Sequence, residues 1–150
     1  MKTLVIGAAI IDIIMKIKRL PKSGEDILCS ETVSAVGGCA YNVAGTLRGF
    51  GVDHDLFVPV GRGMYGDMIA GDLEKLGYQI LIREEESDNG YCLCLVEEDG
   101  ERTFITVKGA EGRFRPSWFE QLSQDAYDSI YVAGYQVCGT SGGVISDWVA

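Results

Sequence analysis

The sequence predicts an α/β fold with a largely parallel sheet. Three observations indicate this class: short apolar runs alternate with segments of helical spacing, two glycine-rich turns lead from a predicted strand into a predicted helix, and the first apolar run is almost uninterrupted. A strand that is apolar on both faces is typical of a parallel sheet with helices on both sides.

The composition is that of one globular domain. The chain has 150 residues, 47% of them hydrophobic and 23% charged, with 20 glycines and 3 prolines. This length suits one domain with a buried core, and the composition excludes a disordered or low-complexity chain. The formal net charge is −9. Nucleic acid and anionic membranes are therefore not expected as partners.

Cysteine and histidine usage argues against a metal site. The chain has five cysteines without C-x-x-C spacing and one histidine, His54, whereas structural zinc needs four such ligands at short spacing. The thiols fit a reducing compartment, which predicts a cytoplasmic protein. Asp12 interrupts the N-terminal apolar run, so a signal peptide is not expected, and no run is long enough to span a membrane.

The first third of the chain predicts a strand, an excursion and a helix. Residues 3–11 form an apolar run that predicts one buried strand, with Asp12 at its carboxyl end. Residues 13–36 change to short alternating runs, which predicts an antiparallel excursion. Gly37 and Gly38 then open a helix that runs to about Phe50.

The rest of the chain continues the alternation. Strands are expected at residues 56–60, 78–82, 91–96, 103–107 and 129–132, and helices at residues 67–76 and 116–123. A turn at residues 98–101 makes residues 91–107 hairpin-like. A further amphipathic pattern begins at Gly142 and reaches Ala150 without a stop signal, so we expect the chain to end within an element.

The first glycine turn suits recognition of a hydroxyl group. Adjacent Gly37 and Gly38 allow backbone N–H groups to approach a ligand at a helix N-terminus, and Asn42 adds one donor group and one acceptor. The alternative is a Gly-Gly turn that serves only to reverse the chain.

The second glycine turn suits a nucleotide. Residues 61–66 match G-x-G-x-x-G between a predicted strand and a predicted helix, and Glu84, Glu85 and Glu86 follow about twenty residues later, where an acid would bind ribose. This pattern supports an alternative function, a dinucleotide-binding oxidoreductase domain. The bulky side chains in the turn and its place after a later strand weigh against it.

Asp12 is the third candidate. A carboxylate at the carboxyl edge of a parallel sheet lies where open α/β sheets bind ligands, and it can accept hydrogen bonds from two vicinal hydroxyls. The alternative is a cap of a helix or loop.

The pattern from Gly37 to Ala44, followed by Gly51 and Gly61, resembles the first signature of the ribokinase-like (PfkB) carbohydrate kinase family. Asp12 and residues 60–67 also resemble this family, and the similarity runs from about residue 3 to residue 136. It implies a ribokinase-like Rossmann-type sandwich with a mainly parallel sheet. Residues 1–150 would be the N-terminal part of a single domain, with a small β lid at about 13–36 and 91–107. The C-terminal part of the fold would be absent from this chain.

The resemblance also implies a reaction and a set of site residues. The family transfers the γ-phosphoryl group of ATP, with Mg²⁺ and in some members a monovalent cation, to a hydroxyl of a sugar or nucleoside. The implied acceptor-binding residues are Asp12, Gly37, Gly38, Cys39, Asn42 and Gln136. Cys39 stands where ribokinases carry lysine and Gln136 where they carry an acid, and both departures weigh against ribose itself.

The family's catalytic motif, a Gly-Ala-Gly-Asp turn, is not found in these residues. We therefore expect the general base and most of the site for ATP and Mg²⁺ beyond Ala150, and no kinase activity from the 150 residues alone. The lid often serves as a homodimer surface in such kinases. A third possibility is a non-catalytic sugar-binding module.

Overall fold

The apolar run at the N-terminus forms the centre of a parallel sheet. In the computed structural model, which describes residues 1–150, strand β1 (Lys2–Ile6) pairs with β4 (Asp53–Phe57) on one side and with β9 (Ser129–Val132) on the other. Side chains of a strand alternate between faces, and Leu4, Val5 and Ile6 are all fully buried. Helices therefore cover both faces of this central sheet, as the apolar run predicts.

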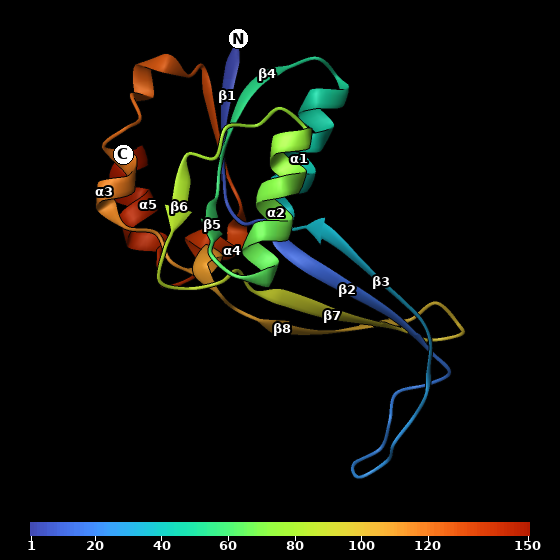
Figure 1. The fold of residues 1–150 in the computed structure, drawn as a ribbon. Coiled ribbons are helices and arrows are strands. Elements are labelled where there is room, and N and C mark those ends of the chain that lie inside the picture. The colour runs from blue at the N-terminus through green and yellow to red at the C-terminus, as the bar shows by residue number, and fades with distance from the viewer.

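One apolar core lies on each face of the central sheet. Helices α1 (Cys39–Gly49) and α2 (Met64–Lys75) cover one face, and α3 (Pro116–Phe119) and α5 (Gly142–Val149) lie on the other (Figure 1). The first core contains Val5, Ala9, Ile11, Ala40, Ala44, Leu56, Val58, Val60, Ile69 and Leu73. The second contains Leu4, Ile6, Phe57, Ile82, Phe114, Phe119 and Ile145.

A second sheet projects away from this body (Figure 1). Its strands are β2 (Ile10–Ile17), β3 (Cys29–Gly37), β7 (Tyr91–Val96) and β8 (Arg102–Val107), in the order β3-β2-β7-β8. We call these four strands the projecting sheet. β2 and β7 are parallel, whereas the two outer pairs are antiparallel.

The remaining elements are short. β5 (Pro59–Gly61) and β6 (Ile82–Glu84) form a parallel pair, α4 (Gly134–Val137) follows β9, and 3₁₀ turns occupy Ala110–Gly112 and Gln124–Ala126. None of the helices has the length and hydrophobicity needed to cross a membrane.

Most predicted elements are confirmed to within a few residues. The structure shows the mixed α/β fold with mainly parallel strands, both long helices, the strands β7, β8 and β9, and the antiparallel pair β2–β3. Gly51 and Gly77, just past the ends of α1 and α2, have positive φ angles of 67° and 83°. They end these helices as glycine commonly does.

The prediction of one strand over residues 3–11 is wrong. β1 ends at Ile6, residues 7–9 bend, and Ile10 begins β2 in the projecting sheet. Asp12 therefore lies within β2, opposite Ala35 of β3, and not at the carboxyl end of a central strand. Hydropathy could not reveal this break, because the bend is as apolar and as buried as the strands around it.

Three other predicted boundaries also differ. Residues 56–60 belong to two sheets, because the chain passes from β4 to β5 at Pro59, which lacks an N–H to donate to a continuous ladder. Residues 78–81 form no strand. Tyr78 instead bonds His54 through its hydroxyl (2.8 Å). The helix expected over residues 116–123 ends at Phe119, and a turn at residues 120 and 121 follows it.

Candidate functional site

The ends of β1 and β9 and the start of α1 converge on Gly7. A Cβ atom at Gly7 would lie 2.7 Å from the Cβ of Ala40 and 2.9 Å from the Cβ of Ala133. Only glycine fits between the side chains of these two alanines. This point is the carboxyl edge of the central sheet, where open α/β folds bind ligands.

Gly38 brings the start of α1 against the same edge. Its φ angle is +103°, and a Cβ atom here would lie 2.5 Å from the carbonyl oxygen of Ala8. Both the conformation and the contact require glycine. The carbonyl of Gly38 accepts the N–H of Asn42 (3.0 Å), which begins the helix.

Asp12 reaches this edge from the projecting sheet. Its carboxylate lies so close to Gly37 that a Cβ atom on Gly37 would overlap it. The structure thus brings Asp12, Gly37 and Gly38 together, although Asp12 comes from an element other than the one predicted. Gly37 therefore does more than reverse the chain, because its lack of a side chain leaves the space that the carboxylate of Asp12 occupies.

The carboxylate of Asp12 is half-buried and has no protein partner. Among the hydrogen bonds and ion pairs of this structure none involves its side chain, and burial raises its pKa above the ordinary value. A carboxylate that is partly removed from water without a partner costs stability. It can also accept hydrogen bonds from a hydroxyl-bearing ligand.

Cys39 and Asn42 lie on the exposed face of the first turn of α1. No side chain caps this helix, and its first turn carries no acidic residue. Asn42 also lines a hollow of about 450 Å³ between α1 and the turn at Leu76 and Tyr78. Both residues are available to a ligand, and neither side chain is engaged within the chain.

Gln136 lies close to the same edge of the central sheet. It lies in the short helix α4, is buried, and places its Oε1 atom 3.6 Å from the position of a Cβ on Gly7. The structure therefore brings Gln136 to the edge at Gly7.

Sequence reasoning missed the neighbours of Asp12 in the projecting sheet. The register places Cys92 and Thr106 in the row of Asp12, and Thr106 lies with its Oγ1 3.5 Å from the Cys92 Sγ. Cys94 and Phe104 occupy the next row on the same face. Burial raises the pKa of the Cys94 thiol. The alternation of residues 91–96 is visible in the sequence, but the pairing of β2 with a strand about 80 residues later is not.

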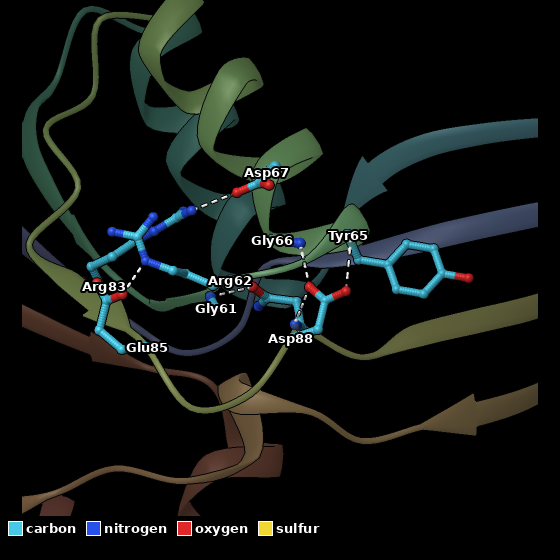
Figure 2. Close-up of polar contacts among 9 residues, drawn as sticks. Gly61, Arg62, Tyr65, Gly66, Asp67, Arg83, Glu85 and Asp88 are labelled. Carbon is cyan, nitrogen blue, oxygen red and sulfur yellow. Dashed lines mark hydrogen bonds and ion pairs between the residues drawn. The ribbon is translucent and has the colours of Figure 1, made fainter.

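The second glycine turn is filled from within the chain (Figure 2). The carboxylate of Asp88 accepts the backbone N–H groups of Tyr65 (3.1 Å) and Gly66 (2.6 Å) at the start of α2. A Cβ on Gly63 would overlap the same carboxylate. The donors that a nucleotide phosphate would need are thus already bonded to an internal anion.

The acids proposed to bind ribose in this alternative are also engaged. Glu85 pairs with Arg62, as Figure 2 shows. Glu84 is buried and lies 2.6 Å from Arg115, which also lies 3.5 Å from Glu86. The geometry therefore gives the dinucleotide interpretation no support. No three His, Cys, Asp or Glu side chains converge as metal ligands.

Known proteins match the chain over nearly its whole length. Residues 1–144 match the pfkB family carbohydrate kinases. The chain is 38% identical over 146 residues to an uncharacterized sugar kinase, YegV, of Escherichia coli (strain K12), a match that covers 97% of this chain and 46% of that protein.

The solved structures that share the fold include two ribokinases. The ribokinase of Giardia lamblia superposes with a TM-score of 0.79 at 24% identity, over 89% of this chain and 42% of that one. The ribokinase of Cryptococcus neoformans var. grubii serotype A, in complex with ADP, gives 0.78 at 20% identity, over 97% and 44%. The chain spans less than half the length of these proteins. On the family match over residues 1–144, it belongs to the pfkB family of carbohydrate kinases.

Proposed function

We propose that this chain carries the acceptor-binding part of a kinase that transfers phosphate from ATP to a hydroxyl group of a sugar or nucleoside. Residues 1–150 would be the N-terminal part of a single ribokinase-like domain. Family membership supports the reaction class. The observation that carries the acceptor role is the half-buried carboxylate of Asp12, which lies beside Gly37 and has no protein partner.

Each site residue has a role that follows from its chemistry. Asp12 accepts hydrogen bonds from two hydroxyls of the acceptor. Gly37 and Gly38 allow the acceptor to approach the backbone, and Asn42 supplies an amide donor and an acceptor. Cys39 and Gln136 border the acceptor from α1 and from α4.

The projecting sheet acts in this proposal as a lid. Because Asp12 belongs to it, the sheet and the start of α1 hold the acceptor from opposite sides. The face opposite Asp12 carries the half-exposed apolar side chains of Ile105 and Val107. We assign this face to a homodimer contact. We keep the cytoplasm as the location, where the five cysteines would remain reduced.

The proposal includes ATP and Mg²⁺, which we assign mainly to the part of the kinase outside these 150 residues. The only nucleotide-like turn is filled by Asp88, and no group of side chains here fits a metal ion. We therefore derive no catalytic step through either group from these residues, and we expect the 150 residues alone to be inactive.

The test is the substitution Asp12→Ala in the full-length protein. It leaves acceptor hydroxyls unpaired, so acceptor binding should weaken by roughly 2–4 kcal/mol, while the KM for ATP changes little. Steady-state kinetics over a panel of sugars and nucleosides would measure both constants. Asp26→Ala, which removes an exposed carboxylate from the β2–β3 loop, is the control. An acceptor kcat/KM within a few-fold of wild type in Asp12→Ala would show that the assignment is wrong.

A further inference from the structure

A buried asparagine joins the body of the protein to the acceptor site. Asn89 precedes β7 and is 3% exposed. Its Oδ1 accepts the N–H of Gly61 (2.6 Å), and its Nδ2 donates to the carbonyl oxygens of Ala9 (3.1 Å) and Pro59 (3.0 Å). Both amide protons and the amide oxygen are thus bonded to backbone groups.

The bond to Ala9 acts on the bend that connects β1 to β2. The carbonyl of Ala8 packs against Gly38 at the start of α1, while the carbonyl of Ala9 is held by Asn89. Asp12 follows three residues later on β2. The two peptides of this bend therefore set the position of Gly38 on one side and of Asp12 on the other.

A second contact fixes β2 to the residue after Asn89. The N–H of Ile11 donates to the carbonyl of Gly90 (3.3 Å), and the N–H of Gly90 donates to the buried carboxylate of Glu111 (2.7 Å). Glu111 also accepts the N–H of Gly109 (2.9 Å). The segment that carries Asn89 is thus also hydrogen-bonded to Glu111, which follows β8 in the chain.

Close packing prevents this segment from shifting. A Cβ on Gly90 would overlap the carbonyl of Val107, and a Cβ on Gly109 would overlap the backbone of Gly90. Because the segment that carries Asn89 is closely packed, it cannot shift at low energetic cost. The bend at residues 7–9 is therefore held in the geometry that the side chain of Asn89 sets.

We propose that Asn89 is a positioning residue for the acceptor. It acts through the bend at Ala8 and Ala9 and fixes the distance between Asp12 and Gly38. This inference rests on the proposed function, because it requires that Asp12 binds the acceptor. It adds a residue that has no contact with the acceptor but determines how well the acceptor is held.

The test is the nearly isosteric substitution Asn89→Asp in the full-length protein. The aspartate keeps an oxygen for the N–H of Gly61, but places a second oxygen against the carbonyls of Ala9 and Pro59. At pH 8 we expect the acceptor KM to rise about tenfold and the KM for ATP to stay within twofold. At pH 6 partial protonation lets the side chain donate to one carbonyl again, so the ratio of variant to wild-type acceptor KM should fall. Using the ratio at each pH removes the titration of Asp12 itself.

Three further variants separate the possible outcomes. Tyr127→Phe removes a part-buried hydrogen bond to Asp55 (2.8 Å) near the opposite edge of the central sheet, and controls for lost stability. Asn89→Thr is uncharged and covers the case in which the aspartate prevents folding. It should raise the acceptor KM about threefold, since one hydroxyl can donate to only one carbonyl. Asp12→Ala tests the proposed function separately.

The inference is overturned if Asp12→Ala raises the acceptor KM while both Asn89 variants leave it within error of wild type. It is also overturned if the Asn89 variants change both KM values and kcat together, in proportion to their loss of stability, in the same way as the control variant Tyr127→Phe. If Asp12→Ala itself has no effect, the proposed acceptor site fails, and the role of Asn89 fails with it for that separate reason.

Discussion

At the scale of single residues, Asp12 is the side chain whose surroundings oppose its charge. It is half-buried, it lies against Gly37, and no group of the protein compensates its carboxylate. A residue retained for stability would be expected to have a partner. A carboxylate without a protein partner is explained if a ligand supplies the hydrogen-bond donors.

The environment of Asp12 predicts that the substitution Asp12→Asn has opposite effects on protein stability and on acceptor binding. Because burial raises the pKa of Asp12, the folded protein binds a proton at a pH at which the unfolded chain has lost it. The free energy of unfolding therefore falls as the pH rises from the ordinary pKa of the unfolded chain to the raised pKa of the folded protein. Above the raised pKa the loss of stability has reached its full size. Asp12→Asn should thus stabilise the protein at pH 7.5, by up to about 1 kcal/mol, and weaken acceptor binding.

Urea denaturation at pH 7.5 and at progressively lower pH would measure how much Asp12→Asn raises the free energy of unfolding. This difference from wild type should vanish below the ordinary pKa of 3.8. Acceptor affinity of the wild type should fall over the same acidic range, as the carboxylate becomes neutral. A variant less stable than wild type at pH 7.5 would mean that Asp12 has a structural partner.

At the scale of elements, the start of α1 depends on one backbone conformation. Gly38 combines a positive φ angle with contact to the carbonyl of Ala8, so it fixes the distance between the helix and the bend before β2. Gly45 lies in the same helix, and a Cβ atom added there would meet no other atom within 4 Å. The two glycines provide a matched pair.

We expect Gly38→Ala to cost roughly 2–3 kcal/mol, because alanine meets both an unfavourable φ angle and the carbonyl of Ala8. Gly45→Ala should stabilise the protein by about 0.5–1 kcal/mol, as alanine is the better helix former. The free energy of unfolding from urea titrations measures both, and the acceptor KM should rise only for Gly38→Ala. Equal effects of the two substitutions would contradict this role of Gly38.

The elements also show what the sequence could and could not predict. The helix after Gly38 and the strands 91–96 and 129–132 follow from local patterns of apolar residues and glycine, and they are confirmed. The bend at residues 7–9 was missed because its only signal is three-dimensional, the packing of Gly7 against Ala40 and Ala133. Asn89 was missed for the same reason, because its three backbone partners come from distant parts of the chain. The implied site residues were found through a family pattern, and their roles stay predictions.

At the scale of the whole molecule, the projecting sheet has two faces with different proposed tasks. Phe104 and Ile105 are neighbours on β8, and both are more than half exposed, but their side chains point to opposite faces. Phe104 shares the face of Asp12, while Ile105 lies on the face assigned to the homodimer.

Substituting each of these neighbours by lysine should separate the two tasks. Ile105→Lys should weaken dimerisation at least about tenfold by burying a charge, and leave the acceptor KM near wild type. Phe104→Lys should raise the acceptor KM and leave the dimer intact. Analytical ultracentrifugation measures the first effect and steady-state kinetics the second. If Ile105→Lys dissociates at the wild-type concentration, the homodimer does not use this face.

The order in which the central strands pair has a consequence for the newly made chain. β1 is synthesised long before β9, yet one of its edges pairs with β9, so that Thr3 lies opposite Ser129. Contacts this distant in sequence close slowly, and until they close they leave a buried strand with an unpaired edge. On the ribosome β1 can acquire β4 early, but it must wait for more than seventy further residues before its other side is covered. A strand whose Leu4, Val5 and Ile6 are fully buried in the folded protein therefore keeps one edge open until β9 emerges, and we expect the nascent chain to need protection from aggregation during that stage.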